Sequence, residues 1–167
     1  MTKSILAAAL VVLSFTSLAL ADNIKIPKEN PVATVTVPGS WKPEETDHGY
    51  AIESPDQVAT VILEATSKKG LEKLIGESID WLTKEQGVKV DASSKKDQDF
   101  ELGGRQWSRL SWDASSKDYG PSVVGFLFTE VGKGKVLTVT YWITKKDNEK
   151  HMDTLEKIFS SVKPIGE

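Results

Sequence analysis

Two strongly apolar runs joined by a short glycine-containing segment restrict the fold of this chain more than any other feature. Residues 123–131 and 136–144 are rich in β-branched and aromatic side chains, which is the composition of strands. The connection Gly132-Lys133-Gly134-Lys135 holds two glycines, and glycine adopts the positive φ angles that a tight turn needs. The sequence therefore predicts an antiparallel hairpin.

The first of these runs is apolar on both of its sides. Alternate residues of a strand point to opposite faces, so Val124, Phe126 and Phe128 share one face. Val123 and Leu127 share the other. A strand with a single buried face would carry polar residues at every second position, so the pattern predicts a central strand that is covered above and below.

The second run is more one-sided. Leu137, Val139, Tyr141 and Ile143 share one face, whereas Thr138, Thr140 and Thr144 share the other. Trp142 is the exception on the threonine face. We expect the aliphatic face to be the better buried of the two.

Two segments have the apolar periodicity of helices that pack on a sheet. Residues 71–86 gather their apolar side chains within an arc of about 160°, and Gly87 follows at a position where glycine commonly ends a helix. Residues 148–162 gather theirs within about 120°, with Asp147 or Asn148 as the N-cap. The apolar residues are Leu71, Leu74, Ile75, Ile79, Trp81 and Leu82 in the first segment and Met152, Leu155, Ile158, Phe159 and Val162 in the second.

The order of elements along the chain favours an α+β fold. Strand patterns precede the first predicted helix and more strands separate it from the second, without a regular β-α-β alternation. The sequence therefore predicts a mainly antiparallel sheet of about six or seven strands with two main helices, 71–86 and 148–162. The other strands are expected at 33–37, 50–54, 58–66, 88–91 and 105–113, and residues 100–102 lead into the last of these.

The first 21 residues have the pattern of a signal peptide. Lys3 precedes an apolar stretch from Ile5 to Leu20, and Ala19-Leu20-Ala21 is a small-x-small cleavage pattern. The alternative is an uncleaved membrane anchor, although the stretch is short against the roughly 20 apolar residues of a span. We expect a mature chain of residues 22–167 that forms one domain and has no membrane span after cleavage.

Composition excludes several classes of function. Cysteine is absent, which excludes disulfides, a thiol nucleophile and thiolate metal sites. Without Lys3 the mature chain has 20 basic and 24 acidic residues, and this net negative charge argues against nucleic acid as a partner. The chain has no Asn-x-Ser/Thr acceptor for N-glycosylation, so export to a bacterial periplasm or exterior is the favoured location.

A set of turn residues and the order of elements resemble a known superfamily. These features are Val35-x-Val37-Pro38-x-x-Trp41, Leu102-x-Gly104 before a long strand, the hairpin, and a last helix that ends Phe159-Ser160-Ser161-Val162-Lys163-Pro164. Together they are similar to the PsbP-like superfamily over nearly all of the mature chain. The resemblance implies an αβα sandwich around an antiparallel sheet. Its members include photosystem II extrinsic proteins, a Ran-GTPase release factor and many exported bacterial proteins, and it supplies no catalytic motif to transfer.

The sequence contains no recognised catalytic, metal or cofactor motif. Its two histidines, His48 and His151, fall in different predicted elements and in no spaced metal motif. The segment Gly132-Lys133-Gly134-Lys135 joins two strands and does not open a helix, so it is a hairpin turn and not a phosphate loop. We therefore predict no catalytic, cofactor-binding or metal-binding residue and a non-enzymatic accessory protein that acts through a protein–protein surface. The alternative is a hydrolase or metal-dependent enzyme whose site forms only in three dimensions.

One loop is the best candidate for contact with a protein partner. It carries Trp41 beside Glu44, Glu45, Asp47 and His48, and an aromatic residue next to polar ones is a common interface composition. In the alternative, the tryptophan folds back and closes the end of the core, and the acidic residues are ordinary solvated surface.

Overall fold

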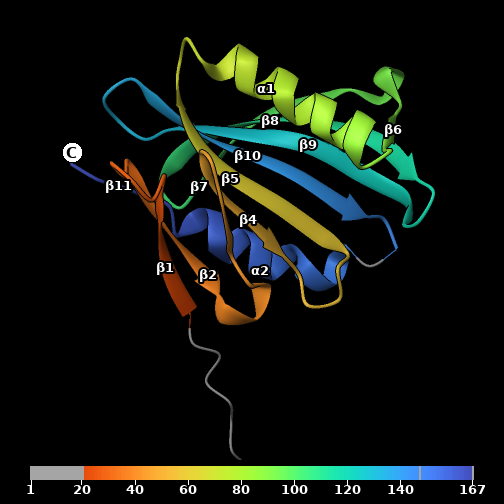
Figure 1. Ribbon diagram of the computed structural model, residues 1–167, viewed down its shortest axis with the longest axis horizontal. Helices are drawn as coiled ribbons and strands as arrows, with labels where there is room; N and C mark the ends of the chain where they lie inside the picture. Colours follow the sequence, from red (N-terminus) through yellow and green to blue (C-terminus); the bar gives the residue numbers. More distant parts are fainter. Residues whose placement is uncertain (1–20, 147, 167) are drawn as a thin grey trace, which may run out of the picture.

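The computed structural model describes residues 21–146 and 148–166, which form two antiparallel sheets and two α-helices (Figure 1). The predicted signal segment, apart from Ala21, and the predicted cap residue Asp147 lie outside the described residues. The helices are α1 (Leu71–Asp80), which continues as a π-helical turn (Trp81–Glu85), and α2 (Glu149–Ser160). The strands are β1 (Ala21–Ile26), β2 (Ala33–Pro38), β3 (Glu44–Thr46), β4 (Gly49–Glu53), β5 (Ala59–Ser67), β6 (Lys89–Val90), β7 (Lys96–Leu102), β8 (Arg105–Ser116), β9 (Gly120–Glu130), β10 (Lys135–Thr144) and β11 (Lys163–Pro164).

The larger sheet has eight strands in the described part of the chain, in the order β3-β4-β5-β10-β9-β8-β6, with β7 paired to β8. All of its pairs are antiparallel, as predicted. The count exceeds the predicted six or seven because β3 and β7 form in segments that were not predicted as strands. The predicted strand 33–37 instead joins a small sheet of order β1-β2-β11.

The predicted hairpin is the centre of the larger sheet. β10 lies between β5 and β9, and the turn between β9 and β10 has positive φ at Gly132 (84°), Lys133 (52°) and Gly134 (70°). The Lys135 backbone N–H donates to the Gly132 carbonyl at 2.9 Å and closes the turn. The two glycines therefore supply the left-handed backbone that this turn requires.

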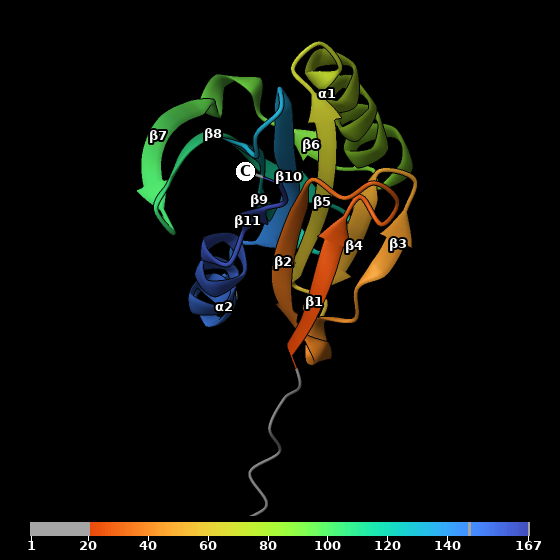
Figure 2. The same cartoon turned by 90° about the vertical axis from the view of Figure 1, so that its left-hand side faces the viewer.

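Helix α1 covers one face of the larger sheet, and α2 covers the other together with the small sheet (Figures 1 and 2). This is an α+β fold with the layers of an αβα sandwich. The main hydrophobic cluster lies on the α2 face, where side chains of β5 and β10 meet β2 and α2. A smaller cluster lies under the end of α1 and includes Leu82, Val88, Val124 and Trp142. Within residues 21–146 and 148–166, no helix has the length and apolar character needed to cross a bilayer.

Both faces of the central hairpin are buried. Phe126 is 2% exposed, as predicted, with its ring stacked beside Phe128. The prediction that β10 is one-sided is wrong, because every residue from Val136 to Thr144 is buried. Helix α1 lies over the threonine face, where the Thr140 hydroxyl donates to the Ser78 hydroxyl at 3.2 Å.

The buried face of α1 differs from the predicted one. Leu74, Ser78 and Leu82 face the sheet at spacings of four, whereas Ile79 is exposed. The polar Ser78 faces the sheet because it accepts a hydrogen bond from the buried Thr140 hydroxyl. A prediction from apolar periodicity takes no account of such a polar contact. Gly87 ends the helix with a φ of 63°, as predicted.

Candidate functional site

Trp41 lies inside the protein. It is 3% exposed, belongs to the main hydrophobic cluster, and its ring meets the His151 ring edge-on with centroids 5.5 Å apart. A short 3₁₀ turn, Gly39–Trp41, follows β2 and directs the indole into the core. This is the position expected of a residue that closes the end of the core.

The other residues of the predicted loop are spread along a hairpin. Glu44 and Glu45 lie on β3, and Asp47 and His48 form the turn into β4. All four are exposed, and Glu45 forms an ion pair with Lys28 at 2.7 Å. The structure therefore keeps these polar residues together on the surface but separates them from the tryptophan.

A serine, an aspartate and a histidine meet on the α2 face in a geometry that does not suit catalysis. The Ser54 hydroxyl donates to the Asp56 carboxylate, which also binds His151 Nε2, and both distances are 2.8 Å. In a hydrolase the histidine must contact the serine, whereas here the aspartate stands between them. The Ser54 oxygen also accepts the backbone N–H groups of Val58 and Ala59. The group therefore ties the β4–β5 turn to helix α2.

The contacts with Ser54 and His151 lower the pKa of the Asp56 carboxyl. Burial raises the pKa of its carboxyl, but the hydrogen bonds from Ser54 and His151 together outweigh burial and hold the pKa below the ordinary value. Within the described residues, no group of three or more histidine, aspartate or glutamate side chains is placed to hold a metal ion.

A cleft of about 470 Å³ lies between helix α2 and the sheet. We call it the α2 cleft. Most of its lining is apolar, which is typical of ligand and anchor sites. The apolar lining consists of Phe100, Leu102, Val123, Leu127, Ile143, Met152, Leu155 and Phe159. Met152, at 49% exposed, leaves a flexible apolar side chain at the surface of this site.

Arg109 is half-buried in this lining and has no ion-pair partner among the described residues. Arg109 pairs with Leu127 across β8 and β9 and therefore points to the α2 face. One terminal nitrogen donates to the Gln98 side chain, while the buried Nε has no hydrogen-bond partner in the described part of the chain. No carboxylate of the described residues forms an ion pair with this guanidinium. The exposed Glu101 and Glu156 also line the cleft.

Tyr141 lies beside this arginine in the cleft. Burial raises the pKa of its phenol, and the opposing effects of the Arg109 guanidinium and of a hydrogen bond with Ser111 do not cancel that rise. The phenol is therefore a neutral hydrogen-bonding group at physiological pH. Its ring occupies space that a side chain at Gly125 would fill, since a Cβ there would stand 2.6 Å from the Tyr141 oxygen.

A wider groove of about 810 Å³ opens beside the start of α1, but its charged groups already have partners. Lys68 forms an ion pair with Glu130, and Ser108 donates to Asp99 at 2.6 Å. Arg105 donates to the Glu130 carbonyl at 3.0 Å. The smaller α2 cleft is the better candidate because it combines apolar surface with an arginine that has no ion-pair partner among the described residues.

Sequence reasoning did not identify the α2 cleft. Arg109, Tyr141 and Met152 are far apart in the chain and are brought together only by strand pairing and by the position of α2. One signal was present, because Arg109 falls on the same face of a predicted strand as the buried Trp107. A charged residue on the same strand face as a core tryptophan indicates that its charged group lies beside an apolar surface.

Comparison with known proteins identifies the fold. No protein-family model matches the chain, and no curated protein matches its sequence. The solution structure of cyanobacterial PsbP (CyanoP) from Synechocystis sp. PCC 6803 is similar with a TM-score of 0.57 at 9% identity, over 96% of this chain and 99% of that chain. LpqN, involved in cell envelope biogenesis of Mycobacterium tuberculosis, is similar with a TM-score of 0.54 at 13% identity, over 87% and 92%. The fold is therefore PsbP-like, and at these identities the similarity concerns the fold alone.

Proposed function

We propose that this protein is a non-enzymatic, exported accessory protein that binds a partner protein through the α2 cleft. The observation that carries this proposal is the Arg109 guanidinium, which lies in an apolar cleft without a carboxylate partner. The guanidinium is half-buried and its buried Nε has no partner among the described residues, so a carboxylate that approaches it gains a charged hydrogen bond. The partner chemistry that fits is an apolar side chain with one carboxylate beside it.

A protein segment fits the mouth of the cleft. Met152 is exposed there, and the half-buried rings of Phe100 and Phe159 also reach it. Methionine and aromatic residues are enriched at protein interfaces. The exposed Glu101 and Glu156 favour basic residues in the flanking parts of the segment.

The arrangement of Ser54, Asp56 and His151 supports a non-catalytic role. The only histidine of this cluster contacts the carboxylate and a tryptophan ring, and the serine oxygen is used by the turn. These contacts leave the serine without a base to activate it.

The location proposed for the protein rests on the first residues of the chain. An apolar stretch ending in Ala19-Leu20-Ala21 is typical of a cleaved signal peptide, and LpqN, which has a similar fold, is involved in cell envelope biogenesis. N-terminal sequencing of exported protein should give Asp22 as the first residue. A mature chain that still contains Lys3 would contradict the export proposal.

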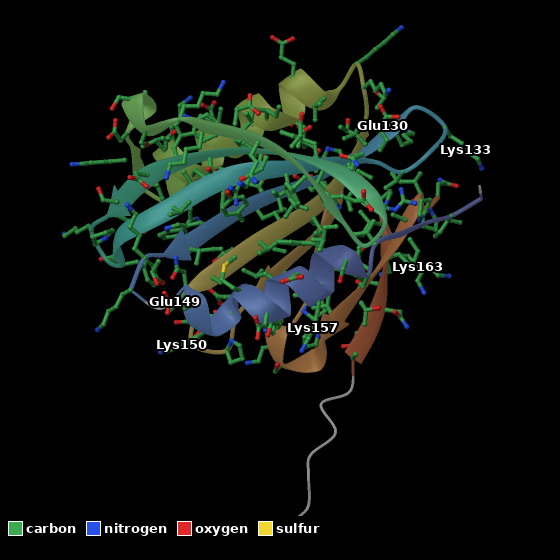
Figure 3. The ribbon with its side chains drawn as sticks, turned by 180° about the vertical axis from the view of Figure 1, so that it is seen from behind. Glu130, Lys133, Glu149, Lys150, Lys157 and Lys163 are labelled. Atoms are coloured by element: carbon green, nitrogen blue, oxygen red, sulfur yellow. The ribbon has the colours of Figure 1, made fainter. Side chains whose placement is uncertain are left out.

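Selection of phage-displayed random peptides on the mature chain tests the binding proposal. We expect enrichment of an apolar residue next to Asp or Glu, and a loss of affinity of at least about 10-fold with Arg109→Gln, because a charged hydrogen bond is lost. Lys157→Gln is the matched control, since it removes one positive charge from an exposed part of α2 that does not line the cleft (Figure 3). Equal binding to both variants would refute the proposal. Binding of laurate with no peptide selected would show a lipid site instead of a protein site.

A second contact is proposed at β3, the edge strand of the larger sheet in the described chain. Glu44, Glu45, Asp47 and His48 are exposed along this hairpin, so a basic partner segment could meet them. Glu44→Lys combined with Glu45→Lys should then weaken binding of the partner with little change in stability. Unchanged binding would remove this hairpin from the interface.

A further inference from the structure

Strand β7 forms the edge of the larger sheet on the side opposite β3 (Figure 2). It pairs with β8 along one side, and no described strand pairs with its other side. The pairing runs without a bulge from Lys96 to Leu102, and none of these seven residues is proline. Proline and bulges are devices that keep a further strand from adding to an edge. The backbone of β7 is therefore open to another extended chain.

The turn between β7 and β8 determines which backbone groups of β7 point outward. Its two residues, Gly103 and Gly104, have φ angles of 60° and 73°, as in a type I′ hairpin turn. In such a hairpin the flanking residues Leu102 and Arg105 bond to each other, and bonded and non-bonded pairs alternate along the strands. Every second residue of β7 therefore directs its N–H and C=O away from β8. These residues are Asp97, Asp99 and Glu101, which we call the acidic edge.

The side chains of the acidic edge are exposed carboxylates on the α1 face of the sheet, opposite to Phe100 and Leu102. Their neighbours across β8 are Gln106, Ser108 and Leu110, none of which is charged. No ion pair within the described residues involves any of the three carboxylates. A strand added beside β7 therefore meets three negative charges on this face.

The α2 cleft reaches the same edge. Phe100, Glu101 and Leu102 all line it. Neighbouring residues of a strand point to opposite faces, so a lining that includes all three in succession extends to the edge of the strand. The end of α2 lies against the β7–β8 turn, since a Cβ at Gly103 would stand 2.5 Å from the Ser160 carbonyl oxygen. An extended chain beside β7 therefore places every second side chain at the mouth of the cleft.

The charges of the acidic edge decide between two kinds of added strand. A second copy of β7, paired about a two-fold axis at Asp99, would set Asp97 opposite Glu101 and the two Asp99 carboxylates opposite each other. Like charges in these positions are destabilising, and charged edge residues commonly protect against pairing of identical strands. A segment with lysine or arginine at alternate positions is attracted by the same charges. The acidic edge therefore disfavours a second copy and favours a basic segment.

We propose that the partner segment binds as an extended strand that adds to β7. This inference rests on the proposed function and specifies the conformation and the sequence pattern of the partner. The backbone of the segment bonds to the outward N–H and C=O groups of the acidic edge. Its side chains alternate between the α2 cleft, where they are apolar or carry the carboxylate for Arg109, and the acidic edge, where they are lysine or arginine.

Amide hydrogen exchange of the mature protein, followed residue by residue by nuclear magnetic resonance, tests this binding mode. The probe is the peptide with the highest affinity from the phage selection. In the free protein the amides of the acidic edge should exchange fast, because they face water. Saturating peptide should slow their exchange at least about 10-fold. The amides of Gln98 and Phe100 are the internal control, since they bond to β8 and should exchange slowly with and without peptide.

Methylation of the peptide backbone gives a second test. N-methyl groups at alternate residues of the peptide should abolish binding, because they remove donors to β7, and the same groups at the intervening residues should be tolerated. Asp97→Lys combined with Glu101→Lys should weaken binding about 10-fold, because lysine at these positions repels basic side chains. Asp118→Lys is the matched control. It reverses an exposed charge in the β8–β9 turn, at the other end of β8, and should leave the affinity unchanged.

The results separate this inference from the proposed function. Binding that depends on Arg109 but leaves the exchange of the acidic edge unchanged, or that shows no alternation in the N-methyl series, would refute strand addition and keep the proposed function. The absence of any selected peptide, or binding independent of Arg109, would refute both. Slower exchange of the same amides at higher protein concentration without peptide would show pairing of two copies, and would also overturn the inference.

Discussion

Replacing Trp41 by alanine should strongly destabilise the protein. The indole is 3% exposed, and a buried tryptophan removes roughly 150–250 Å² from water. At about 25 cal/mol per Å² this corresponds to roughly 4–6 kcal/mol of transfer free energy, part of which alanine retains. The edge-on contact with His151 adds about 0.5–1.5 kcal/mol. Measured truncations of buried aromatic residues fall at about 3–5 kcal/mol, so we expect a loss of about 4 kcal/mol.

Urea denaturation of residues 22–167 measures this loss directly. The midpoint should fall for Trp41→Ala while the slope with denaturant stays unchanged, because the substitution removes packing without changing the surface exposed on unfolding. Trp41→Phe is the matched variant. It keeps an aromatic ring beside His151 and should lose less than about 2 kcal/mol.

The reasoning would be refuted by a loss below about 1 kcal/mol for Trp41→Ala. Such a small change would mean that the indole lies at the surface. The tryptophan would then belong to a contact with a partner, and not to the end of the core.

Phe126→Ala should lower the free energy of unfolding by about 3–5 kcal/mol in denaturant melts, since Phe126 is buried under α1; a change below about 1 kcal/mol would contradict the two-sided cover of the sheet. Asp56→Asn should destabilise the protein at pH 7, and the difference from the natural protein should shrink as pH falls below 3.8, because the folded pKa of Asp56 is lowered and its contribution is lost on protonation. Glu64→Gln should stabilise the protein at pH 7. Burial raises the folded pKa of Glu64, and the opposing effect of His48 does not cancel that rise, to which the Glu77 carboxylate adds, so the natural protein loses stability as pH rises above 4.5. In melts the advantage of the variant should be present at pH 7 and shrink at pH 4, and an advantage of equal size at both pH values would contradict this reasoning.

The sequence predicted the parts of the fold in which apolar pattern and burial agree. The two-sided pattern around Phe126 gave the central strand, and the glycines at positions 132 and 134 gave its turn. Trp107 and Trp112 lie on opposite faces of β8, since this long strand alternates between the two hydrophobic clusters.

Polar strands at the edges of the fold were not predicted. β3 and the start of β7 consist largely of exposed polar residues, and backbone hydrogen bonds and polar side-chain contacts, not apolar packing, hold them to the sheet. The periodicity of apolar residues does not predict strands that pair without burying apolar side chains. The inward orientation of Trp41 was one of two alternatives that the sequence left open, because the exposed acidic residues after it fit a surface contact equally well.

The candidate site depends on contacts between distant parts of the chain. Arg109 enters the α2 cleft because its strand pairs in a register that places it beside Leu127. Tyr141 fits there because Gly125, opposite it on β9, has no side chain. Neither the register nor the position of α2 is encoded in a local motif.

Nuclear magnetic resonance of the mature protein with a selected peptide tests the central claim most directly. Intermolecular contacts between the peptide and the side chains of Leu127, Ile143 and Met152 would place the peptide in the α2 cleft, and Arg109→Gln should abolish them at the same peptide concentration. Contacts confined to β3 or to the groove beside the start of α1, or contacts unchanged by Arg109→Gln, would contradict the account.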